Sequence, residues 1–110
     1  MKTNSEYVDA WIKRNSSPNG VVYKIVNVVT GDEYIGKTTL PLKRCWYKHV
    51  TMANMDKGGL LYESIRAWGK ECFDIKIVHS CSPDEDYSVV CKKLIYDTSP
   101  SLNKLHKNIY

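Results

Sequence analysis

The chain has 110 residues, a formal net charge of +4, and 43% hydrophobic and 25% charged residues. This length suits one folded domain, because a domain of this size buries roughly two thirds of the surface that its unfolded chain exposes. No apolar run approaches the roughly 18 residues that a membrane span needs, and the N-terminus lacks the apolar stretch of a secretory signal. We therefore expect a single-domain intracellular, cytoplasmic protein without a membrane partner.

The four cysteines, at positions 45, 72, 81 and 91, show no Cys-x-x-Cys spacing. A reducing compartment would keep them as thiols, and most are expected to act as small buried hydrophobic residues. The modest positive charge permits a polyanionic partner without requiring one. The positions of the charges therefore matter more than their sum.

The N-terminal part begins with residues 1–19, where apolar residues spaced as one helical stripe predict a short amphipathic helix over 4–14, followed by a linker. The β-branched run 21–29 and the shorter run 33–37 predict two strands. Turn-forming residues, Thr30-Gly31-Asp32, lie between them. The two strands are therefore expected to form a β-hairpin.

A helix is predicted to begin after Pro41, which suits a first helical turn, and to run to about Asn54. Gly58-Gly59 then breaks the chain before a second helix, which Gly69 closes. The apolar residues of both helices recur at intervals of three and four: Leu42, Cys45, Trp46, His49, Val50 and Ala53 in the first, and Leu61, Ile65 and Trp68 in the second.

The C-terminal part starts with an alternating run, residues 73–77, that predicts a third strand with one core face. Ser82-Pro83-Asp84-Glu85 matches a capping box and predicts the start of a last helix, which residues 98–103 end. The apolar side of that helix carries Tyr87, Val90, Cys91, Leu94 and Ile95. The last residues, 106–110, form a basic tail.

The order of the predicted elements is helix, strand, strand, helix, helix, strand, helix. It predicts an α+β fold in which a small three-stranded antiparallel sheet is flanked by helices, with an extra N-terminal helix ahead of a domain over residues 20–105. Both faces of the first strand carry apolar residues, so the sheet is expected to be covered on both sides.

Five polar side chains are expected to converge where the hairpin meets the first helix after it. They are Tyr23, Tyr34, Lys37, Arg44 and His49. Phosphodiester cleavage needs a base to activate water, a cation to stabilise the charge that grows on the phosphate, and usually a metal ion. These residue types suit that chemistry, although buried tyrosine rings and a solvated basic helix face explain the same pattern without any site.

Two triplets separated by the hairpin turn resemble the motif of the GIY-YIG nuclease family. Val21-Val22-Tyr23 stands at the first triplet, with valine in place of glycine and Gly20 just before it, and Tyr34-Ile35-Gly36 matches the second outright. The resemblance continues through the order of the later helices and the third strand, over roughly residues 20–105. It implies the GIY-YIG endonuclease-like fold.

The resemblance also implies roles for individual residues. Tyr23 would assist the base that activates water, Tyr34 would position the phosphate, Arg44 would stabilise its charge, and His49 would support both. A glutamate on the last helix would hold one Mg²⁺ or Mn²⁺ ion in an active enzyme. We expect the phosphate to be bound by Gly36, Lys37, Lys43 and Lys48.

Two positions depart from the family pattern. The arginine and histidine of the family are commonly four residues apart, whereas Arg44 and His49 are five apart, and Cys45 lies four residues before His49. Cys91 stands where the family has its metal-binding glutamate, so the metal ligand is unknown. A magnesium ion prefers oxygen ligands, which makes a cysteine a poor substitute.

These departures leave several interpretations. The chain is either an active nuclease that uses Arg44 and another carboxylate, such as Glu63, Glu85 or Asp86, or a degenerate member that binds DNA or a nucleotide without cutting. The missing acid favours binding in the Tyr23, Tyr34 and Arg44 pocket with cleavage weakened or lost. A zinc site made of Cys45, His49 and Cys91, and a protein-interaction module on the same fold, are further alternatives.

Overall fold

A computed structural model describes residues 18–103 of the chain. Its elements are β1 (Val21–Asn27), β2 (Glu33–Thr38), α2 (Leu42–Asn54), α3 (Leu60–Trp68), the 3₁₀ turn η1 (Lys70–Cys72), β3 (Phe73–Ser80), α4 (Tyr87–Thr98) and the 3₁₀ turn η2 (Ser101–Asn103). The helix predicted over 4–14 and the tail 106–110 lie outside the described residues. Within the described part, no helix is long and apolar enough to cross a membrane.

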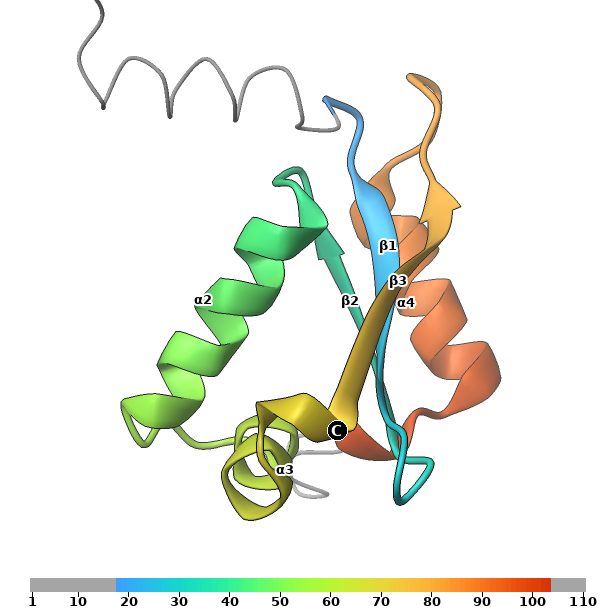
Figure 1. Cartoon of the computed structure of the whole chain (residues 1–110). Coiled ribbons are helices and arrows are strands. Elements are labelled where there is room, and N and C mark those ends of the chain that lie inside the picture. The colour runs from blue at the N-terminus through green and yellow to red at the C-terminus, as the bar shows by residue number, and fades with distance from the viewer. Residues whose placement is uncertain (1–17, 104–110) are drawn as a thin grey trace, which may run out of the picture.

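The three strands form one antiparallel sheet in the order β2-β1-β3. Helices α2 and α3 lie on one side of this sheet and α4 lies on the other (Figure 1). The prediction of an α+β fold with a small three-stranded antiparallel sheet flanked by helices is therefore confirmed.

The central strand β1 is covered on both faces, because its side chains alternate between two separate cores. Tyr23 and Ile25 pack in the larger core with residues of α2 and α3, whereas Val22 packs with Cys91 of α4 in the smaller one. Val22 and Ile25 are each 0% exposed. A strand that is buried on both faces needs a continuous apolar run, which is what the sequence of β1 supplies.

The start of α4 differs from the capping-box prediction. The carboxylate of Glu85 does accept the Ser82 N–H at 2.9 Å, as a capping box requires, but this bond closes a separate turn. The helix begins later, where Asp86 is the N-cap and accepts the Ser88 N–H at 2.9 Å. Asp86 caps the helix because its carboxylate accepts the free N–H two residues ahead.

Two predicted core positions are instead largely exposed. Trp68 and Ile77 are both 47% exposed. Trp68 is the last residue of α3, and Ile77 lies on an edge strand, so each has fewer neighbours than the middle of the sheet offers. The strand prediction itself is confirmed, since β3 extends to Ser80.

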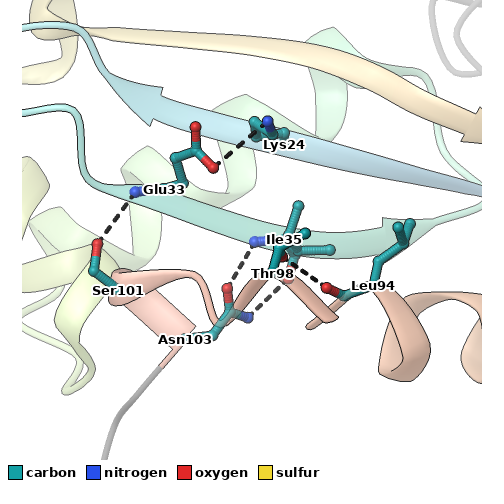
Figure 2. Close-up of polar contacts among 7 residues, drawn as sticks. All are labelled: Lys24, Glu33, Ile35, Leu94, Thr98, Ser101 and Asn103. Carbon is teal, nitrogen blue, oxygen red and sulfur yellow. Dashed lines mark hydrogen bonds and ion pairs between the residues drawn. The ribbon is translucent and has the colours of Figure 1, made fainter. Parts of the chain in front are cut away.

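The outer edge of β2 is held by the turn that follows α4, as Figure 2 shows. Asn103 accepts the Ile35 N–H at 2.7 Å and donates its amide N–H to the Ile35 carbonyl at 2.9 Å. Ser101 accepts the Glu33 N–H at 3.3 Å. These side chains satisfy backbone groups that an edge strand would otherwise leave free for another chain.

Asn103→Asp should lower the free energy of unfolding at pH 7 by about 1–3 kcal/mol, because the new carboxylate oxygen would face the Ile35 carbonyl where an N–H donates now. Urea unfolding measures the difference. Asn19→Asp, which adds the same charge at an exposed position, is the matched control and should cost less than about 0.5 kcal/mol. Equal stability of the two variants would contradict the role given to Asn103.

Candidate functional site

A pocket of about 420 Å³ lies beside the outer edge of β2. Its lining comes from both sides of the sheet, because it includes His49 of α2 and Tyr62 of α3 as well as Cys91 of α4. Both motif tyrosines, Tyr23 and Tyr34, also line it. The hairpin and the helices on the two faces therefore meet at one concave site.

Gly36 makes the position of Tyr23 possible. The two residues lie opposite each other in the β1–β2 register. A Cβ atom on Gly36 would lie 2.4 Å from both Cζ and Oη of Tyr23, which is closer than non-bonded atoms approach. The absence of a side chain therefore lets the Tyr23 ring lie across β2 toward α2, and this explains why the second triplet ends in glycine.

The hydroxyl of Tyr23 is 2.7 Å from Nε2 of His49, a short hydrogen bond between β1 and α2. The rings of Tyr34 and Tyr62 pack around the imidazole, with centroids 5.7 Å and 5.9 Å from it. Three aromatic residues from three elements thus hold the histidine in place.

Burial shifts the pKa values of the histidine and of two of the tyrosines. Burial, and then the charge of Lys48, lowers the pKa of His49 to about 4. Burial, and then the nearby Tyr62, raises the pKa of Tyr34 to about 12. Burial, and then the neighbouring Cys45 thiol, raises the pKa of Tyr23 further. At neutral pH both phenols keep their protons and the imidazole is uncharged.

A neutral imidazole carries one proton on one of its two ring nitrogens, so the Tyr23 hydroxyl either donates to Nε2 or accepts from it. In both cases the hydrogen bond occupies Nε2 and leaves Nδ1 to find another partner. Among the described residues, Nδ1 is the buried side-chain polar atom without a hydrogen-bond partner. Such an orphaned atom costs about 1–3 kcal/mol, and a fold that keeps one often does so at a functional site.

Of the expected phosphate-binding residues, Gly36, Lys37 and Lys48 line the pocket. Both lysines are exposed. Lys37 also donates to the Ser88 hydroxyl at 2.7 Å, and its Nζ lies 5.1 Å from the centroid of the Tyr87 ring. Two ammonium groups are therefore present at the site, one of them tied to α4.

Arg44 and Lys43 are not part of this lining, so the expected convergence of Arg44 with the tyrosines and His49 does not occur. Arg44 lines a neighbouring hollow of about 390 Å³, which shares Leu40 and Lys48 with the pocket. The reason is angular: residues five apart lie about 140° apart around a helix, so α2 directs His49 into the pocket and Arg44 toward the neighbouring hollow. Cys45, four residues before His49, lines the pocket instead.

No aspartate or glutamate belongs to the lining of the pocket within the described residues. The three candidate acids lie elsewhere, with Glu63 exposed on α3 and Glu85 and Asp86 ahead of α4. Cys91 lines the pocket, as the family resemblance implied, and burial raises the pKa of its thiol. Because Mg²⁺ and Mn²⁺ favour carboxylate oxygens, the residues of this pocket do not fit either ion.

The alternative zinc site is also not formed. Among the described residues, the metal-ligand side chains that come together in a group of three are His79, Cys81 and Glu85, not Cys45, His49 and Cys91. Cys45 packs in the core beneath Tyr23, and Cys91 packs in the core beside Val22. The two thiols thus belong to opposite sides of the sheet.

The lining also contains residues that the sequence pattern did not identify, among them Tyr62 and Asn103. Tyr62 follows Leu61 on the buried side of α3, so its place beside the apolar stripe was the available signal. Asn103 was visible only as part of a helix-ending segment. Their contribution depends on long-range packing that no local pattern reveals.

Comparisons of the chain with models of protein families, with curated proteins and with solved structures found no match. The class that the structure itself defines is a small α+β protein with a three-stranded antiparallel sheet between helices and a tyrosine- and histidine-lined pocket at one sheet edge.

Proposed function

We propose that this chain is a GIY-YIG-type protein whose edge pocket binds the phosphate group of a nucleic acid or a nucleotide, with phosphodiester cleavage weakened or lost. The observation that carries the proposal is the pocket itself. It gathers Tyr23, Tyr34 and His49 with two exposed lysines and, among the described residues, no carboxylate in its lining.

Binding is favoured by the kind of groups that the pocket presents. A phosphate ester is recognised by ammonium groups and by O–H or N–H donors. Lys37 and Lys48 supply the charge, and the phenol of Tyr34, whose pKa burial raises to about 12, is protonated at neutral pH and can donate its O–H. Among the described residues, the lining holds no carboxylate that would repel an anion.

Cleavage is disfavoured by the same groups. Activation of water needs a base with a free lone pair and a pKa near the working pH. Nε2 of His49 is already hydrogen-bonded to the Tyr23 hydroxyl, and a pKa of about 4 makes the imidazole a weak base. Tyr23 has a raised pKa and therefore cannot act as a phenolate at neutral pH without help.

Lys48→Gln should weaken binding about 3- to 10-fold. It should also reduce the slope of the logarithm of the affinity against the logarithm of the salt concentration by about one. Fluorescence anisotropy with a labelled DNA duplex, and competition by a free nucleotide, measure this and separate the two ligand classes. Lys43→Gln is the matched control, because it removes the same charge from α2 outside the pocket. We expect its effect to be smaller.

Equal losses of affinity for the two lysine variants, or no binding of DNA or nucleotide at low salt, would contradict the proposed phosphate-binding site.

Plasmid nicking tests the second part of the proposal, that phosphodiester cleavage is weakened or lost. If the wild type nicks plasmid DNA with Mg²⁺ or Mn²⁺ and Tyr23→Phe abolishes the nicking, the protein is the alternative, an active metal-dependent endonuclease. The observation that favours that alternative is that Tyr23, Tyr34 and His49, to which the family resemblance gives catalytic roles, line one pocket.

A further inference from the structure

Three metal-ligand side chains of different chemistry meet at the end of β3, away from the edge pocket. They are His79 on the strand, Cys81 directly after it, and Glu85 in the turn that precedes α4. One ligand atom from each of them lies within 4.8 Å of the other two. None of the three lines the edge pocket, so this cluster needs an explanation of its own.

A β-bulge turns His79 toward this cluster. Tyr23 pairs with Ile77, but Val22 pairs with His79, so Val78 is an extra residue on β3. Without the extra residue, His79 would share a face with Ile77; with it, His79 shares the face of Val22, which α4 covers. Bulges often re-aim a side chain beside a site, and this one brings the imidazole to the side of the sheet on which α4 begins.

The other two ligands are held by bonds that involve the backbone. The Cys81 N–H donates to the Gly20 carbonyl at 3.0 Å, and the Cys81 side chain is buried. The Glu85 N–H donates to the Ser82 carbonyl at 3.0 Å, while the Glu85 carboxylate accepts the Ser82 N–H at 2.9 Å. The carboxylate therefore stays directed at Nε2 of His79, 2.9 Å and 3.1 Å from its two oxygens.

We propose that His79, Cys81 and Glu85 form a zinc-binding site. A thiolate, an imidazole nitrogen and a carboxylate oxygen are the three ligand types that zinc accepts, and the thiolate favours zinc over magnesium or calcium. Three protein ligands leave the fourth tetrahedral position to water. Binding displaces the thiol proton of Cys81 to solvent and ties the end of β3 to the turn that leads into α4.

The test is a titration of the full-length reduced protein with Co²⁺, which occupies zinc sites and gives a charge-transfer absorption when a thiolate is bound. We expect one Co²⁺ per chain with this absorption, displaced by Zn²⁺. Cys81→Ser should abolish the thiolate band, and His79→Gln should weaken Co²⁺ and Zn²⁺ affinity at least about 10-fold. Cys72→Ser is the matched control, because Cys72 lies outside the cluster and should leave the band unchanged.

Circular dichroism shows whether each variant is folded, and the partly exposed His79 is the safer substitution if the buried Cys81 does not tolerate serine. Zn²⁺ should raise the midpoint of thermal unfolding of the wild type more than that of His79→Gln. The proposal is overturned if the folded wild type gives no thiolate band with Co²⁺. It is also overturned if the band survives in Cys81→Ser, or if Zn²⁺ stabilises His79→Gln as much as the wild type.

Discussion

Gly36→Ala should destabilise the protein by about 1–3 kcal/mol and abolish ligand binding in the edge pocket. The new Cβ would overlap the Tyr23 ring, 2.4 Å from its Cζ and Oη. The ring cannot easily move away, since Tyr23 is only 3% exposed and its hydroxyl is bonded to His49. Urea unfolding and anisotropy with labelled DNA measure the two effects.

Gly58→Ala is the control for this substitution. Gly58 is exposed, and a Cβ there would meet no atom within 4 Å. We expect its stability and its binding to match those of the wild type. If Gly36→Ala behaves like Gly58→Ala in both measurements, the close approach of Tyr23 to β2 is not what shapes the pocket.

The stability of the fold should decrease by about 1–3 kcal/mol between pH 7 and pH 4 because of His49 alone. Its pKa is lowered to about 4 by burial and by Lys48, whereas an unfolded chain has a histidine pKa of about 6.5. Between these values the unfolded state binds the additional proton, so stability is present above pH 6.5 and is lost as the pH falls toward 4. The magnitude is reduced from the full linkage value because the imidazole is only partly buried.

Urea unfolding of the wild type and of His49→Gln, compared at pH 7 and pH 4.5, isolates this contribution. The pKa of Glu85 is also lowered, through its bonds to Ser82 and His79, but this group titrates in both proteins and cancels in the difference. We expect the wild type to lose more stability than the variant. If both proteins lose the same free energy of unfolding between the two pH values, burial does not lower the pKa of His49.

Local sequence patterns determined the elements and the sheet. The β-branched run of β1, the turn at Gly31 and the three- and four-residue spacing in α2 each depend on a few neighbouring residues, and their predictions are confirmed. The prediction of where α4 starts was wrong because Ser82 and Asp86 both offer capping oxygens. Only the turn geometry selects between them.

The candidate site was partly predictable for the same reason. Tyr23, Tyr34 and His49 could be placed together because the hairpin register and the face of α2 follow from local periodicity. Arg44 was misplaced because it lies on another face of α2 than His49. Tyr62 and Asn103 were missed because they reach the pocket from elements distant in the sequence.

The sequence by itself therefore determined which side chains each element presents, because a strand repeats every two residues and a helix every 3.6. The tertiary structure decided which of these groups meet and how their pKa values shift. Packing between α2, α3 and the sheet buries His49 and Tyr23, and burial lowers the pKa of the imidazole to about 4 and raises the pKa of the phenol. The bulge at Val78 turned His79 toward Cys81 and Glu85, because one extra residue in a strand reverses the face of every residue that follows.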